Sequence, residues 1–155
     1  MAGQITAATW QVELLEWARA APRALPLRIA VFVDEQGVPA DIEHDDWDAR
    51  SLHAIASDAA GHVVGTGRLL PDGHIGRMAV ARDARGHGIG SALLRALMAE
   101  AARRGHQRLL LHAQRDAVRF YAVHGFQISG AEFLEAGIVH LPMTRELPKQ
   151  DYGLP

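Results

Sequence analysis

The sequence predicts a single mixed α/β domain, and three observations support this prediction. A chain of 155 residues with 48% hydrophobic and 22% charged residues has the size and balance of one globular domain. Its first half contains short β-rich segments, whereas its second half alternates helix and strand, which requires a crossover in the sheet. The absence of cysteine excludes disulfides, thiol catalysis and cysteine-ligated zinc.

The N-terminal segment is expected to contain a strand followed by helical segments. Thr, Trp and Val favour a strand over residues 5–12, and residues 13–20 have helical composition. Pro22 and Pro26 are expected to interrupt the chain. The apolar pattern of residues 27–36 then predicts a helix up to the Gly-Val-Pro sequence that follows it.

A meander of three strands is predicted next. Residues 52–57, 62–70 and 74–80 are short and β-rich. The turn signals Asp58-Ala59-Ala60-Gly61 and Pro71-Asp72-Gly73 separate them.

The second half of the chain is expected to alternate between helices and strands. Apolar residues recur at three- and four-residue steps over 88–104, which predicts the clearest helix of the chain, with Gly105 as its C-cap. The remaining predicted elements are a strand at 108–113, a helix at 116–124, and strands at 126–129 and 138–145. The domain is expected to span residues 1–147, and residues 148–155 are expected to form a tail.

Net charge and hydropathy exclude several classes of protein. The net charge of −2 argues against sequence-independent nucleic-acid binding. No basic leader or membrane-length apolar stretch is present, so a cytoplasmic protein without a membrane partner is expected. The charge is unevenly distributed: residues 34–48 contain seven acids and no Lys or Arg, whereas residues 77–119 contain nine arginines and three acids.

Three alternating glycines separate a predicted strand from the longest predicted helix. Gly86, Gly88 and Gly90 would allow close approach to backbone N–H groups at the positive end of the helix dipole, which is a site for phosphate. The only lysine is Lys149, so this is not a Walker loop, and the glycine spacing does not match the dinucleotide fingerprint. From spacing alone, the glycines could equally form nothing more than a tight turn.

Two motifs in order resemble the GNAT acetyltransferase superfamily. Arg85-X-X-Gly88-X-Gly90 is similar to its acyl-CoA diphosphate loop. The family's Asn-X-X-Ala-X-X-Phe-Tyr…Gly-Phe segment is matched by Gln114-X-X-Ala117-X-X-Phe120-Tyr121-X-X-X-Gly125-Phe126. Over residues 27–147 the chain resembles the ElaA-type branch at Leu27-Arg28-X-X-Val31-Phe32-Val33-X-Glu35-Gln36, Asp45, Asp48, His53, Gly76-Arg77, Ala113-Gln114 and Glu135-X-Gly137-Ile138-X-His140-X-X-Met143.

The resemblance implies a GNAT-type acyl-CoA N-acyltransferase fold, with a central twisted mixed sheet of about six or seven strands and about four helices. It also implies that two strands diverge and admit the pantetheine arm of acetyl-CoA as an extra strand would enter. No metal is expected. The implied coenzyme-binding residues are Met78, Ala79, Val80, Arg85, Gly86, His87, Gly88, Ile89, Gly90, Ser91, Gln114, Phe120 and Tyr121.

Tyr121 matches the family's general acid, although it could instead only pack beside Phe120. The general base is less defined, because the strand position where the family often has glutamate is Gly76. His112 acting through water is one candidate base, and the others are His140 on the last strand and Glu35, Glu43 and Asp45 from the opposite wall. Glu35, Asp45 and His140 are also the candidates for contact with the amine acceptor.

The acidic run 41–48 has three open interpretations: a solvated loop, a metal site through His44, or an acidic mouth that attracts a cationic amine. The predicted function is direct transfer of acetyl from acetyl-CoA to a primary amine of a small molecule or peptide. A non-catalytic acyl-CoA-binding regulatory module and a purely structural domain are the alternatives. A homodimer is expected only by analogy.

Overall fold

The computed structural model describes residues 10–148. Its elements, in chain order, are β1 (Gln11–Glu16), α1 (Trp17–Arg28), the π-helical segment η1 (Ile29–Glu35), α2 (Ala40–Glu43), the 3₁₀ turn η2 (Asp48–Arg50), β2 (Leu52–Ser57), β3 (Val63–Leu69), β4 (His74–Val80), η3 (Arg82–Ala84), α3 (Ile89–Arg103), β5 (Arg108–Gln114), η4 (Arg115–Ala117), α4 (Val118–Val123), β6 (Gln127–Ile128), β7 (Phe133–Glu135) and β8 (Ile138–Glu146).

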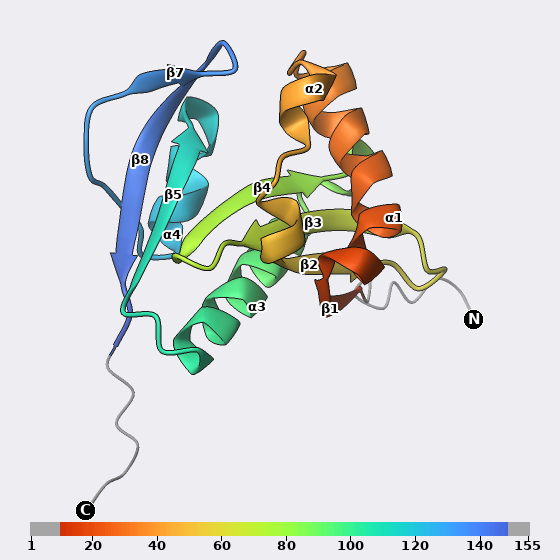
Figure 1. The fold of residues 1–155 in the computed structure, drawn as a ribbon, viewed down its shortest axis with the longest axis horizontal. Coiled ribbons are helices and arrows are strands. Elements are labelled where there is room, and N and C mark those ends of the chain that lie inside the picture. The colour runs from red at the N-terminus through yellow and green to blue at the C-terminus, as the bar shows by residue number, and fades with distance from the viewer. Residues whose placement is uncertain (1–9, 149–155) are drawn as a thin grey trace, which may run out of the picture.

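The strands form one mixed sheet, as the sequence predicts. Across the described residues it has eight strands in the order β1-β2-β3-β4-β5-β8-β6, with β7 paired to β8 (Figure 1). Every pairing is antiparallel except that of β4 with β5, which is parallel. The crossover through α3 joins these two parallel strands and thereby links the two halves of the sheet.

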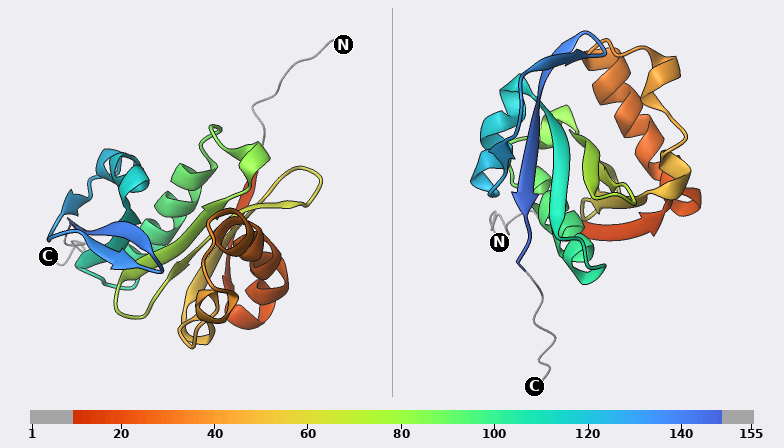
Figure 2. Two further views of the ribbon diagram at one scale, coloured as in Figure 1. Left: turned by 90° about the horizontal axis from the view of Figure 1, so that it is seen from above. Right: turned by 60° about the vertical axis from the view of Figure 1, so that its left-hand side comes forward.

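Helices cover both faces of the sheet, with α1 on one side and α3 on the other (Figure 2). Successive side chains of β2 alternate between these faces: Ile55 packs in the cluster that contains Ala20 of α1, whereas Ala54 packs in the cluster that contains Leu93 of α3. A Cβ at Gly65 of β3 would lie 2.8 Å from the Leu93 side chain. The glycine therefore lets α3 lie close against the sheet.

The N-terminal predictions are corrected in two respects. Residues 13–16 belong to β1 rather than to a helix, because pairing with β2 outweighs their helical composition. Pro22 and Pro26 do not interrupt the chain but lie inside α1, where both are exposed. Ala20 and Ala24 are fully buried on the opposite side of the helix, so the face of α1 that packs on the sheet is free of proline. Residues 5–9 of the predicted first strand lie outside the described residues.

The C-terminal strands are also rearranged relative to the prediction. The strand expected at 126–129 has only two residues, Gln127–Ile128, and β7 was not predicted. Glu135 pairs with Ile138, so β7 and β8 are joined by a two-residue turn. The helix predicted at 88–104 is found at Ile89–Arg103. Residues 149–155 of the expected tail lie outside the described range.

Candidate active site

The cleft of the molecule lies where β4 and β5 separate. These strands pair only at His74 with Leu110 and at Ile75 with Leu111, and they diverge beyond these pairs (Figure 1). The divergence leaves the backbone of β4 from Gly76 onward unpaired on the β5 side. A cavity of about 790 Å³ occupies this position. The predicted residues that line it are Glu35, Glu43, Asp45, Met78, Ala79, Val80, Arg85, Gly90, His112, Gln114, Phe120, Tyr121 and His140.

A bulge in β4 shapes the cleft. The register with β3 shifts between Thr66 paired with Ala79 and Arg68 paired with Gly76, and Arg77 has a φ of 50°. A β-bulge redirects side chains, and here the Arg77 guanidinium donates from Nε to the Glu43 carbonyl at 3.0 Å. At Gly76 a Cβ would meet nothing within 4 Å, so the position where the family often has glutamate is open space.

The glycine-rich turn lies beside the cleft, at the start of α3. Gly86 and Gly88 have φ values of 82° and 85°, in the left-handed region that favours glycine. Gly88 is the N-cap and no side chain among the described residues caps the helix, so the first N–H groups of α3 are available to a ligand. The members of this turn that do not line the cavity are Gly86, His87, Gly88, Ile89 and Ser91.

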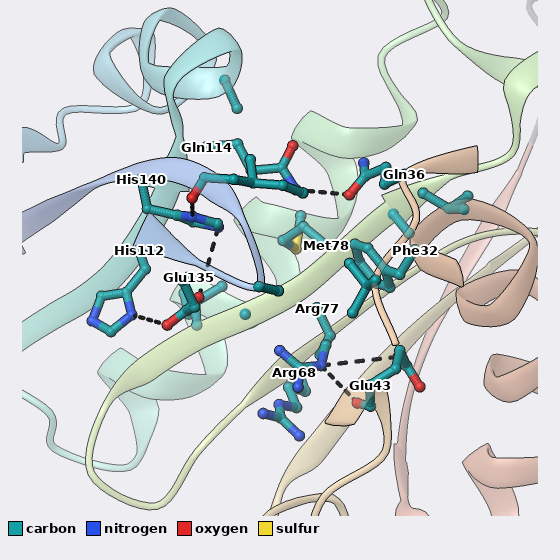
Figure 3. A pocket seen from close by; sticks show the side chains of 18 of the residues that line it. Phe32, Gln36, Glu43, Arg68, Arg77, Met78, His112, Gln114, Glu135 and His140 are labelled. Carbon is teal, nitrogen blue, oxygen red and sulfur yellow. Dashed lines mark hydrogen bonds and ion pairs between the residues drawn. The ribbon is translucent and has the colours of Figure 1, made fainter. Parts of the chain in front are cut away.

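Side-chain contacts connect Glu35, at the end of η1, and Gln36, which follows it, with residues after β4 and on β5. Arg85 donates to both carboxylate oxygens of Glu35, at 2.7 and 2.8 Å, and from Nε to the Val80 carbonyl at 3.1 Å. The hydrogen bond from Arg85 lowers the pKa of Glu35. Gln114 of β5 donates to the side-chain oxygen of Gln36 at 2.8 Å (Figure 3). Glu35, predicted to contact an amine, is therefore paired with an arginine.

Tyr121 of α4 lies at the base of the cleft among aromatic rings. It is 9% exposed, and its ring centroid is 5.0 Å from that of Phe120 and 6.0 Å from that of Phe126. Burial raises the pKa of Tyr121 to about 12. The phenol is therefore protonated at any physiological pH and is available as a proton donor.

The acidic run packs against arginines from three different elements. Arg28 of α1, which is 1% exposed, bonds Asp48 at 2.7 and 3.0 Å and also donates to Glu43. Arg68 of β3 holds Asp45 at 2.6 and 2.9 Å. Burial alone would raise the pKa of Asp48 and Asp45, but the hydrogen bonds and charges of these arginines outweigh it and lower both.

The acidic run is therefore not simply a solvated loop, and its buried carboxylates carry no unmatched charge. Glu43, predicted as a candidate base, is 3% exposed and is bonded to Arg28. Asp45, predicted to contact the acceptor, is bonded to Arg68 and lies 3.3 Å from Arg77. Among residues 10–148, no group of three or more His, Asp or Glu side chains could hold a metal ion.

A different group of titratable side chains lines the opposite wall of the cleft. His112 of β5 shares a hydrogen bond with Glu135 of β7, with Nδ1 and Oε1 3.1 Å apart. His140 of β8 lies on the other side of the same carboxylate, with Nε2 and Oε2 3.6 Å apart (Figure 3). Sequence reasoning identified both histidines but not Glu135, although Glu135 begins the last segment that resembles the ElaA-type branch.

Comparison with known proteins agrees with this geometry. Residues 20–147 match the family model described as an acetyltransferase (GNAT) domain. The chain belongs to the GNAT acetyltransferase family. It is 39% identical over 127 residues to an uncharacterized N-acetyltransferase of Bacillus subtilis, YjcF, an alignment that covers 79% of this chain and 90% of that protein.

Crystal structures of other GNAT-fold proteins superpose on the chain over most of its length. An acyl-CoA N-acyltransferase from Pseudomonas aeruginosa gives a TM-score of 0.79 at 29% identity, covering 88% of this chain and 99% of that one. ElaA from Escherichia coli gives a TM-score of 0.77 at 27% identity, covering 89% and 99%. The predicted family, fold class and acyltransferase activity are thereby confirmed. The helices within the described part of this GNAT acetyltransferase are all too short or too polar to cross a membrane.

Proposed function

We propose that the protein transfers an acetyl group from acetyl-CoA to a primary amine of a small molecule or peptide. The observation that carries the proposal is the combination, in one cleft, of an unpaired strand edge on β4 and the buried phenol of Tyr121, with the N–H groups at the start of α3 next to it. Each part supplies a different requirement of the reaction: coenzyme binding, protonation of sulfur and orientation of the reactants.

The chain's residues fit the coenzyme. The backbone of Met78, Ala79 and Val80 does not pair with β5, so it can bond a pantetheine arm as an added strand would, in place of the Arg85 Nε at the Val80 carbonyl. A Cβ at Gly90 would lie 3.3 Å from the Phe120 ring, so glycine lets this ring pack close to the start of α3, where both residues line the cavity. The turn of Arg85 to Ser91 would hold the diphosphate, and the Gln114 amide would reach the arm from β5.

The reaction is direct attack of the neutral amine nitrogen on the thioester carbonyl carbon. A C–N bond forms, the C–S bond breaks, and the Tyr121 hydroxyl gives its proton to the leaving sulfur. An alkylammonium with a pKa near ~10 is neutral in only about one molecule in a thousand at pH 7, which costs roughly 4 kcal/mol. The cleft therefore gains from a group that removes the ammonium proton.

The non-catalytic alternative is favoured by one observation, the empty space at Gly76 where a strand glutamate would serve as base. Release of thiol from acetyl-CoA across a panel of primary amines separates the two functions. We expect Tyr121→Phe to lower kcat by about 10²-fold or more, with little change in the dissociation constant of the coenzyme. Val123→Ala, at an 80% exposed position of the same helix, is the matched control and should retain activity.

Two outcomes would reject the proposal. Coenzyme binding without thiol release for any amine would support the acyl-CoA-binding module. No uptake of the coenzyme by calorimetry would reject both functions and favour a structural domain. The homodimer expected by analogy stays a prediction.

A further inference from the structure

The cleft is lined by four carboxylates, which differ in their partners. Glu35 is bonded to Arg85, Glu43 to Arg28, and Asp45 to Arg68. Within residues 10–148, Glu135 contacts no arginine or lysine but lies between two imidazoles. A guanidinium is charged at every pH at which proteins fold, so the first three negative charges are permanently matched. Glu135 is the carboxylate whose charge remains available to an incoming cation.

The contacts around Glu135 define its orientation. The Nδ1 atom of His140 lies 2.7 Å from the Ile138 carbonyl, which can only accept, so Nδ1 carries the hydrogen and Nε2 faces Glu135. On the other side, His112 contacts the second carboxylate oxygen through Nδ1. The two rings come from neighbouring strands (Figure 3). The Glu135 side chain is 47% exposed and lines the cavity.

The backbone of the β7–β8 turn places Glu135 in the cleft. The two turn residues, Ala136 and Gly137, have φ values of 52° and 76°, the pattern of a type I′ hairpin. Alanine is strained in this region, and Ala136 itself lines the cavity. Such strain persists where the surrounding structure holds the backbone, which often happens at ligand sites.

Glu135 is also connected, through His112, with the position on β4 where the family often has a glutamate and this chain has Gly76. The pairing of Ile75 with Leu111 would, one residue further, bring Gly76 opposite His112, but there the strands have diverged. The side-chain position at Gly76 is open, and the β5 residue that the register would bring opposite it, His112, is bonded to Glu135.

We infer that Glu135 binds the ammonium group of the acceptor and takes its proton, while His112, which shares a hydrogen bond with Oε1 of Glu135, positions the carboxylate. This inference rests on the proposed function and names the base that the reaction needs. The ammonium gives one proton to Glu135, which passes it to water. After the C–N bond forms, the nitrogen loses a second proton to water, and Tyr121, which has given its proton to sulfur, regains one from water. The net products are the amide, the free thiol and one released proton.

The same charge pattern defines the class of acceptor. One unmatched carboxylate can balance one ammonium, whereas on the opposite wall the Asp45 carboxylate is already bonded to Arg68 and Arg77. A second positive charge on the acceptor would face these guanidiniums without a free carboxylate to balance it. The site therefore prefers monoamines to diamines of the same length.

The first test compares Glu135 with Glu132, a second glutamate in the segment between β6 and β8. Glu135→Gln keeps the shape of the side chain but removes its charge. Glu132→Gln is the matched control, because Glu132 is exposed, bonds Arg115 at 2.7 Å and does not line the cavity. We expect Glu135→Gln to lower kcat/KM for n-butylamine by about 10²-fold at pH 7, with coenzyme affinity unchanged and Glu132→Gln close to wild type.

The pH profile separates a catalytic role from a structural one. The titratable groups that face Glu135 are His112 and His140, and the His74 ring of β4 packs edge-on against His112 with centroids 5.7 Å apart. The nearest permanent charge of the cleft on β4, Arg77, is bonded to Glu43 and Asp45. The defect of Glu135→Gln should shrink as the pH approaches the pKa of the amine, because the substrate then arrives neutral. A defect equal at pH 7 and pH 9.5, or none at pH 7, would overturn the inference.

Binding of n-butylamine tests the inference independently of turnover. Calorimetry with CoA present should show binding of n-butylamine to the wild type, weaker binding of 1,4-diaminobutane, and loss of n-butylamine binding in Glu135→Gln. Glu135-dependent binding without turnover would reject the proposed function but retain the ammonium site. Turnover that survives Glu135→Gln would reject the ammonium site alone, and a preference for the diamine would overturn the assigned substrate class.

Discussion

Both walls of the cleft contain carboxylates, but one wall pairs them with arginines and the other places its carboxylate between histidines. The arginine wall comprises Arg68 and Arg77 with Glu43 and Asp45, together with Arg28 and Asp48, which lie behind them and do not line the cavity. The histidine wall comprises His112, Glu135 and His140. In the first, Arg28 and Asp48 are 1% and 0% exposed, whereas in the second, His112 and Glu135 are 42% and 47% exposed.

The two walls therefore contain charged groups of two kinds: ion pairs that hold the fold together, and a carboxylate that can exchange protons. A buried guanidinium–carboxylate pair has permanent charges and fixed geometry, so it can hold elements together but cannot move a proton. Arg28 in this way joins α1 to the segment that follows it in the chain, through Glu43 and Asp48. A partly exposed carboxylate between imidazoles can exchange protons with a substrate and with water.

The largest expected effect comes from breaking the arginine wall. Asp48→Ala leaves Arg28 buried without its main partner, and we expect a loss of about 3–5 kcal/mol in the free energy of unfolding. Glu13→Ala is the matched control, because it breaks an ion pair with Arg23 in which both side chains are partly exposed, and it should change stability little. Urea denaturation measures both. Similar losses in the two variants would show that the arginine wall has no special structural role.

A smaller effect is expected from pH, and its sign follows from the pKa shifts. Burial lowers the pKa of His53, which lies against Trp17 with ring centroids 4.7 Å apart and faces Arg28, Arg68 and the Asp48 carbonyl. Between the lowered value and the ordinary 6.5, the unfolded chain binds more protons, so stability falls as the pH drops below about 6.5. The lowered pKa of Asp48 makes a contribution that is present above its ordinary value of 3.8 and is lost below it.

The measurement is the melting temperature from pH 7 to pH 3. His53→Gln should reduce the loss between pH 7 and pH 5, although His124, whose pKa burial also lowers, retains part of it. His62→Gln, at a 79% exposed position, is the control between pH 7 and pH 5 and should keep the wild-type loss there. It is not compared at lower pH, because His62 lowers the pKa of Asp58. A profile that His53→Gln leaves unchanged would contradict the assignment to this histidine.

The sequence was sufficient to predict features that depend on residues close together in the chain. The glycines of the turn and the periodicity of α3 lie within a few residues of one another, and both are found where they were predicted. The divergence of β4 and β5, expected from the resemblance, is also found.

The contacts across the cleft could not be predicted, because they depend on distant parts of the chain. The acidic run contains no arginine of its own, and Asp45 meets Arg68 and Arg77, which are 23 and 32 residues away. For this reason the acidic mouth, which was one of the three interpretations of this run, is mostly neutralised in the folded protein. Glu135 was missed for a related reason: β7 has only three residues, and Ala136-Gly137 lacks the usual hairpin signal of Asn-Gly.

The smallest expected effect concerns the turn that holds the histidine wall in place. Ala136→Asn replaces alanine at a φ of 52° with a residue that tolerates this region, and it should raise the free energy of unfolding by about 1 kcal/mol. For a domain of this size that is a gain of roughly 2–4 °C in melting temperature. Ala131→Asn, at an exposed loop position without positive φ, is the control and should give no gain. If Ala136→Asn were destabilising instead, the alanine methyl group in the cleft would have to matter more than the backbone strain, and the turn would contribute contacts as well as position.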